Sequence, residues 1–156
     1  QDAVRVMAEN LDTMAQALAD QGVQILLETH DAWTDSVHVA AVMEKVESEA
    51  VAVLWDTHHP WRTIGEKPEA TWHNIGQWVR NTHWKDSYAD ESKDHGHQLC
   101  LMGEGDLPLQ EIFNILIEGG YEGYHTLEWE KRWHPEIEAP EVALPNFVKT
   151  MREMEE

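Results

Sequence analysis

In four short segments of this chain, an extended run ends at a side chain that divalent metal ions favour as a ligand. The segments are ILLETH, VLWDTHH, NTHWKD and HTLEWE, and the side chains are those of Glu28, Asp56, His83 and Glu128. Three of the runs are apolar or β-branched, as in strands, whereas the run before His83 is a weaker strand pattern. Parallel strands present such groups at their carboxyl ends, where α/β folds place their active sites. The sequence therefore predicts an α/β fold with a site built from four strand ends.

The residue types in this set indicate the kind of ion. Two or more carboxylates with one imidazole suit a hard-to-borderline divalent cation. We therefore expect a single Mn²⁺, Mg²⁺, Co²⁺ or Zn²⁺ as the cofactor.

The charge of the chain limits its partners. Thirty acidic residues against 11 basic ones give a formal net charge of -19, which repels nucleic acid and anionic membranes. Apolar stretches are only a few residues long, and the N-terminus has no signal-peptide pattern. The single cysteine, Cys100, fits a reducing compartment. We expect a cytoplasmic protein with a small-molecule partner, no nucleic acid and no membrane.

Helical and strand patterns alternate along the chain, whose 156 residues are one domain's worth. Helices are expected at 2–20, 34–46, 68–78, 109–119 and 141–156, strands at 23–28, 51–56, 79–85 and 123–129, a loop marked by Pro60, Gly65 and Pro68, and a long loop at 87–106 with an extended piece at 97–102. We expect Thr34 or Asp35 to cap the second helix and Asp106 to cap the fourth. The alternation requires parallel strands joined by right-handed crossovers, so we predict a single domain over 1–156.

Five motifs together carry a family resemblance. In their order and spacing, ETH, WDTHH, HWKDS, GEGDLPL and LEWE resemble the second half of xylose isomerase-like TIM barrels, the sugar phosphate isomerases and epimerases related to endonuclease IV. The resemblance covers nearly the whole chain and implies the C-terminal half of a (β/α) TIM barrel, with four parallel strands alternating with helices. It implies that Glu28, Asp56, His83 and Glu128 hold one divalent metal, and that His59 contacts substrate oxygens.

A half barrel has a structural problem. A complete TIM barrel has eight strands and ~250 residues, whereas this chain offers four strands. Two sheet edges would stay unpaired and the inner face would be open to water. We therefore expect no well-folded lone monomer, but completion by a missing N-terminal half or by self-association. The first residue is Gln1, not methionine, which fits a truncated or processed product.

The metal suggests a chemistry. An ion that chelates the carbonyl and hydroxyl of a ketose acidifies the intervening C–H bond and stabilises the enediolate. Glu28 and Glu128, on opposite faces of the sugar, would remove and return the proton, and the epimerase resemblance implies that each is also a ligand. His59 would orient or polarise a substrate hydroxyl.

Other residues near the strand ends have two interpretations each. Lys85 and Asp86, just past His83, contact the substrate or form an ion pair. Trp129 binds the sugar or belongs to the core, as large aromatic residues at strand ends often do. Glu130 and Lys131 lie on the same rim and are candidates to support the ligands.

Two pairs of histidines have both a structural and a functional interpretation. One of the adjacent His58 and His59 is structural, and the motif spacing favours His59 as the functional one. His95 and His97 suggest a second metal, but the spacing of the Asp-x-His pair of endonuclease IV is absent, so we interpret them as loop residues.

Three classes of function stay open. The first is an enzyme, a divalent-metal-dependent sugar or sugar-phosphate isomerase or epimerase. The second is an inosose-dehydratase-like lyase or an endonuclease-IV-like nuclease on the same barrel, and the charge of -19 disfavours the nuclease. The third is a non-catalytic remnant that binds a metal or a carbohydrate, which the missing half keeps open.

Overall fold

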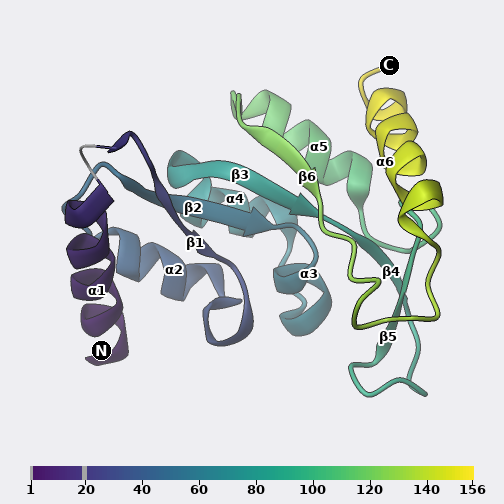
Figure 1. Cartoon of the computed structure of the whole chain (residues 1–156), viewed down its shortest axis with the longest axis horizontal. Helices are drawn as coiled ribbons and strands as arrows, with labels where there is room; N and C mark the ends of the chain where they lie inside the picture. The colour runs from purple at the N-terminus through teal and green to yellow at the C-terminus, as the bar shows by residue number, and fades with distance from the viewer. Residues whose placement is uncertain (1, 19–20) are drawn as a thin grey trace.

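The computed structural model describes residues 2–18 and 21–156. With η for 3-10 helices, the elements in chain order are α1 (Asp2–Leu18), β1 (Ile25–Glu28), η2 (Asp31–Trp33), α2 (Ser36–Met43), β2 (Val51–Asp56), α3 (His59–Ile64), α4 (Pro68–Ile75), η3 (Gly76–Trp78), β3 (Val79–Trp84), β4 (Asp86–Ala89), β5 (His97–Cys100), α5 (Leu109–Glu118), β6 (Tyr124–Leu127) and α6 (Pro140–Met154). Helices and strands alternate around one central sheet (Figure 1). The predicted α/β alternation is confirmed.

The central sheet has four strands in the order β1-β2-β3-β6, and all neighbours are parallel. The register places Asp56 beside His83, so the carboxyl ends of β2 and β3 are level. The weakly patterned run before His83 is a regular strand of this sheet. In residues 2–18 and 21–156, no strand pairs with the outer edge of β1 or of β6. The sheet is therefore half of a (β/α) barrel, as the motifs predicted.

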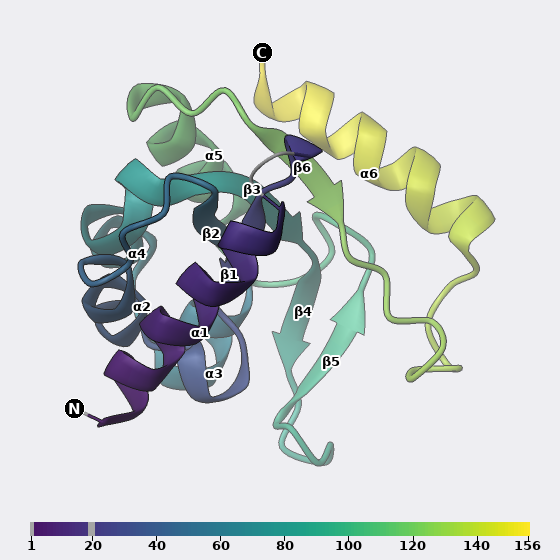
Figure 2. The ribbon, with the colours of Figure 1, turned by 60° about the vertical axis from the view of Figure 1, so that its left-hand side comes forward.

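The main core lies on one face of this sheet. Val53 and Trp55 of β2 and Trp84 of β3 are at most 1% exposed and belong to one cluster with Ile112 and Leu116 of α5. The helices on this side pack in sequence, α1 on α2, α2 on α4 and α4 on α5 (Figure 2). Because successive strand residues alternate faces, Asp56, next to Trp55, points to the opposite face. None of the helices in the described residues is long and apolar enough to cross a membrane.

The segment marked by Pro60 and Gly65 contains a helix, so its prediction as a loop was wrong. Pro60 stands in the first turn of α3, where its missing N–H costs nothing. Gly65 ends the helix in the left-handed conformation, with a φ of 69°. Both residues mark the boundaries of a helix of six residues, too short to show an apolar period.

The expected loop at 87–106 also contains regular structure. β4 and β5 pair as an antiparallel hairpin outside the central sheet (Figure 2). β5 corresponds to the extended piece expected at 97–102, whereas β4 was missed.

One buried side chain fastens this hairpin. Asp86 is 1% exposed and accepts the N–H groups of Ser87 at 2.8 Å, Gly103 and Gly105 at 3.0 Å and Leu107 at 3.4 Å. Burial raises the pKa of this carboxyl, although the four N–H groups favour its charged form. The donors come from both ends of the segment, so Asp86 fixes where the hairpin leaves the sheet.

The two capping predictions had different outcomes. Asp35 caps α2, since its side chain accepts the N–H of Val37 at 2.9 Å. Asp106 does not cap α5, whose N-cap position is Pro108. Its carboxylate instead pairs with Arg62 of α3 and accepts the N–H of Ala89 at 3.2 Å. Asp106 therefore ties the hairpin to α3.

The role of Asp86 can be measured by substitution. We predict that Asp86→Asn lowers the free energy of unfolding by about 1–3 kcal/mol, because the amide NH₂ would face backbone N–H groups that the carboxylate now accepts. Urea denaturation gives the value. Asp94→Asn, which changes an exposed carboxylate of the same segment, is the control and should leave stability unchanged. Equal stability of both variants would contradict this role.

Candidate functional site

The four predicted ligands converge at the carboxyl ends of the central strands. Glu28 and Asp56 are the last residues of β1 and β2, His83 is the last but one of β3, and Glu128 follows β6. Each offers one ligand atom, and these atoms all lie within 4.8 Å of one another. The parallel register is the cause, because level strand ends bring their side chains to one place.

Asp56 has two oxygens in different environments. The side chain is fully buried, and Oδ1 accepts the N–H groups of His58 at 2.8 Å and His59 at 3.0 Å, which starts α3. Oδ2 lies 3.0 Å from the ammonium of Lys85, but it accepts no hydrogen bond from the described residues. A buried polar atom without a hydrogen-bond partner is costly. Oδ2 is thus the oxygen of Asp56 that is available to a cation.

The other contacts of Lys85 explain why Oδ2 of Asp56 accepts no hydrogen bond from it. The side chain of Lys85 is 1% exposed, and Nζ donates to Glu128 Oε2, to Glu130 Oε1 at 2.9 Å and to His59 Nε2 at 3.0 Å. An ammonium has three donors, so these acceptors use all of them. Burial alone would lower the pKa of Lys85, but Asp56, Glu130 and Glu128 outweigh it and hold the pKa above its ordinary range. The structure places Lys85 in an ion-paired cluster.

His83 and Glu28 form the other side of the cluster. Nδ1 of His83 lies 2.9 Å from Oε1 of Glu28 and 3.7 Å from Oε2 of Glu128. The hydrogen bond raises the pKa of His83 and lowers the pKa of Glu28, although burial opposes the charged form of each. The proton of this hydrogen bond lies between Nδ1 of His83 and Oε1 of Glu28.

The cluster fits a divalent metal ion. It combines three carboxylates with one imidazole, the donor set of a hard-to-borderline cation. Oδ2 of Asp56 is a buried oxygen without a hydrogen-bond donor among the described residues, and an ion would satisfy it.

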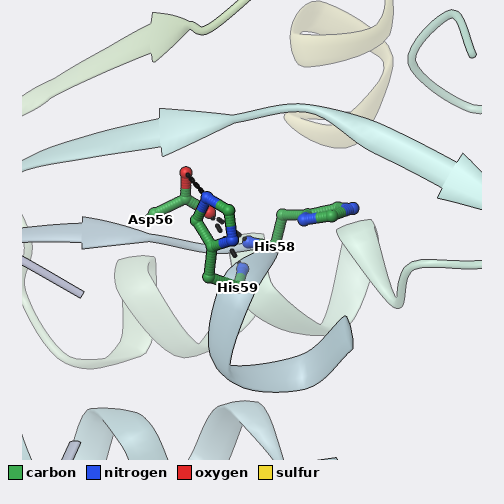
Figure 3. A group of neighbouring side chains, drawn as sticks. All are labelled: Asp56, His58 and His59. Carbon is green, nitrogen blue, oxygen red and sulfur yellow. Dashed lines mark hydrogen bonds and ion pairs between the residues drawn. The ribbon is translucent and has the colours of Figure 1, made fainter. Parts of the chain in front are cut away.

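The adjacent histidines take different positions (Figure 3). The ring of His58 is 1% exposed and points away from Asp56, with Nε2 2.9 Å from Ser87 Oγ; burial lowers its pKa to about 2. The ring of His59 faces Asp56, with Nε2 3.5 Å from Oδ2, and burial lowers its pKa to about 4. Because Nε2 of His59 accepts from Lys85, its ring proton is assigned to Nδ1. Both rings are neutral at pH 7.

Asp56, His58 and His59 also have donor atoms within 4.8 Å of one another. This group is a poorer metal site than the four strand ends. Oδ1 of Asp56 already serves two backbone N–H groups, and His58 turns its ring toward Ser87.

A cavity of about 520 Å³ lies beside the cluster, within the range of ligand pockets. Its lining includes His30, His58, His59, Arg62, Lys85, His95, His97, Glu130 and His134. None of Glu28, Asp56, His83 and Glu128 lines this cavity itself, but His59 and Lys85, which contact Asp56, do. A hollow on α6 of about 570 Å³, lined by Leu144 and Val148 among others, contains neither the four residues nor these two neighbours. We therefore assign the ligand pocket by its chemistry, not by its size.

Two lining histidines, His30 and His134, were not considered in the sequence analysis, and two others, His95 and His97, were interpreted there as loop residues. His30 follows Glu28 by two positions, and its ring centroid lies 4.3 Å from that of His59. His97 opens β5 and His134 follows Glu130 by four positions. For His30 and His134, closeness in sequence to a site segment was the available signal. His97 reaches the cavity because it lies on the β4–β5 hairpin.

Two other candidates from the sequence analysis, Trp129 and Lys131, do not line the cavity. Trp129 donates its indole N–H to the carbonyl of Glu138 at 2.9 Å and is not among the residues that line the cavity. Lys131 donates to the carbonyls of Pro135, at 2.6 Å, and Ile137, so it braces the loop after β6. A substrate contact by Trp129 stays a prediction.

Comparison with known proteins gives consistent matches. A family model described as xylose isomerase-like TIM barrel matches residues 1–151. Fructoselysine 3-epimerase of Shigella flexneri is 28% identical over 127 residues, which cover 78% of this chain and 44% of that protein. Inosose dehydratase of Clostridium beijerinckii is 27% identical over 143 residues, which cover 81% of this chain and 47% of that protein. The crystal structure of a xylose isomerase domain protein from Planctomyces limnophilus superposes with a TM-score of 0.73 at 19% identity, over 94% of this chain and 50% of that one. The chain spans about half the length of these relatives.

Proposed function

This chain belongs to the xylose isomerase-like TIM barrel family, and on that basis we propose that it is the metal-holding half of a sugar or sugar-phosphate isomerase or epimerase. The family resemblance of the motifs is thereby confirmed. One observation carries the proposal, the convergence of Glu28, Asp56, His83 and Glu128 beside a ligand-sized cavity. We propose that these four residues hold one Mn²⁺, Mg²⁺, Co²⁺ or Zn²⁺.

The proposed mechanism is proton transfer on a ketose. A bound ion would polarise the carbonyl and the neighbouring hydroxyl of the sugar and so acidify the C–H bond between them. One of Glu28 and Glu128 takes this proton as the electron pair moves into the enediolate of the sugar, and the other carboxyl returns a proton to carbon. Return to the opposite face of the same carbon gives the epimer. Return to the neighbouring carbon, with the hydroxyl proton passing to the former carbonyl oxygen, gives the isomer.

The neutral imidazole of His59 would position the sugar. Its Nε2 accepts from Lys85, which leaves the proton on Nδ1 free to donate to a substrate oxygen. Lys85 lines the cavity and stays a candidate for substrate contact, although protein acceptors use its three protons.

A dehydratase is the second candidate. The match to an inosose dehydratase is 27% identical, close to the 28% of the match to the epimerase. Both reactions begin with removal of a proton next to a carbonyl, so the same residues would serve. They differ in the next step, since a dehydratase expels a hydroxyl group.

A substrate panel separates these candidates. We expect the completed barrel, loaded with Mn²⁺ in D₂O, to incorporate deuterium into a ketose next to its carbonyl and to form the epimer or isomer. Loss of water from an inosose, without epimerisation of any ketose, would favour the lyase. Nicking of plasmid DNA at abasic sites would single out a nuclease. Metal binding without any turnover by the completed barrel would leave a non-catalytic binding protein.

Substitution of the two site histidines separates metal binding from chemistry. His83→Ala removes an imidazole ligand, so we expect Mn²⁺ affinity to fall at least tenfold. In the completed barrel, His59→Ala should leave Mn²⁺ affinity near that of the wild type, because Glu130 still accepts from Lys85, and reduce turnover by about 10²–10⁴. Isothermal titration and the deuterium assay give the two quantities. Loss of metal by the His59 variant would show that the roles of the two histidines are reversed.

We propose further that another four-stranded unit completes the barrel. The outer edges of β1 and β6 have no partner strand in residues 2–18 and 21–156. Tyr124, at the start of β6, is 81% exposed. An edge of this kind is a template for another strand.

Sedimentation of the 156-residue chain at micromolar concentration tests this completion. We expect self-association, or binding of an added N-terminal half, because unpaired edges and an open inner face destabilise the lone unit. Activity of the unit alone should be low, since part of the substrate wall is missing. A sharp monomer that unfolds cooperatively and ignores the added half would contradict the proposal.

A further inference from the structure

We propose that Lys85 is a stand-in cation, which occupies two of the metal-binding oxygens in the metal-free chain and lowers the affinity of the centre for its ion. We further propose that Glu130 is a positioning residue that draws Lys85 away from those oxygens. Both statements rest on the metal site of the proposed function.

The first argument is that Lys85 and the ion need the same atoms. Oδ2 is the available oxygen of Asp56, because Oδ1 serves two backbone N–H groups. Oε2 is the oxygen of Glu128 that faces the cluster, 3.7 Å from Nδ1 of His83. The ammonium of Lys85 lies 3.0 Å from the first and donates to the second. Lys85 therefore already neutralises two of the four proposed ligands.

The second argument concerns charge. Asp56, Glu128 and Glu130 all reach the same ammonium, and Lys85 is the lysine or arginine that pairs with them in the described part of the chain. Without this cation the metal-free site would hold unpaired carboxylates in a poorly solvated place. With a divalent ion bound, however, the ammonium would lie next to a like charge. The same residue thus stabilises the metal-free state and opposes the metal-bound state.

The third argument is that two acceptors remain for Lys85 when an ion binds. Glu130 Oε1 lies 2.9 Å from Nζ and His59 Nε2 lies 3.0 Å from it, and neither belongs to the four proposed ligands. Lys85 can therefore yield Asp56 and Glu128 to an ion without losing all its partners. The charge of Glu130 favours this position of the ammonium, so Glu130 acts on the metal through Lys85.

Mn²⁺ titration of four proteins tests both statements, namely the wild type, Lys85→Met, Glu130→Gln and the double variant. We expect Lys85→Met to bind Mn²⁺ at least tenfold more tightly, while its metal-free form melts at a lower temperature. Glu130→Gln should weaken Mn²⁺ binding at least threefold in the wild-type background and less than twofold in the Lys85→Met background. This non-additivity is the sign of coupled residues. Lys149→Met, which removes an exposed lysine paired with Glu153 on α6, is the control and should change neither quantity.

Each outcome bears on the inference. Unchanged or weaker Mn²⁺ binding by Lys85→Met, with normal binding by the wild type, would overturn the inference and leave the proposed function intact. An equal effect of Glu130→Gln in both backgrounds would overturn the role of Glu130. Binding by neither the wild type nor Lys85→Met would overturn the metal centre itself. If Lys85→Met does not fold, Lys85→Gln replaces it, because its amide can still donate to Glu130, and the same tightening is expected.

Discussion

The balance of charge around one buried ammonium governs this structure. Asp56 and Lys85 are at most 1% exposed, and Glu128 and Glu130 close the cluster from the loop after β6. Charges in such a place are tolerated only when they are paired and hydrogen-bonded. The parallel register of the strands brings the carboxylates together, so the fold itself creates the need for a cation. Lys85 meets part of this need, and the proposed metal ion would also meet it.

Two elements outside the central sheet, α3 and the β4–β5 hairpin, are each held by one polar side chain at a strand end of the sheet or just after it. Asp56 starts α3 through two backbone N–H groups, and α3 carries His59 toward the cluster. Asp86 fastens the β4–β5 hairpin, which places Ser87 against His58. Asp56 and Asp86 therefore hold the elements that form the cavity wall. This keeps the wall residues in a fixed position relative to the proposed ligands.

Much of this could be read from the sequence, because the informative signals are local. Apolar runs that end at Glu28 or Asp56 are contiguous in the chain, and parallel strands bring such ends together without further information. The hairpin was missed because β4 is only four residues long and its sequence, DSYA, has no apolar run. The position of Asp106 could not be read from local signals, because its partner Arg62 lies far away in the sequence. For the same reason the burial of Lys85 was left open, since its acceptors come from α3 and from the loop after β6. The roles of His59 and Trp129 toward a substrate stay predictions.

The location of the bound ion is the most direct test of this account. Crystals of the chain grown with Mn²⁺, measured near the manganese absorption edge, would show the ion as a peak in the anomalous difference map. The account predicts one strong peak, with oxygen or nitrogen atoms of Glu28, Asp56, His83 and Glu128 within ~2.0–2.6 Å of it. A peak bound by His58 and His59 instead, or a fully ordered site in which any of the four side chains points away from the ion, would contradict it.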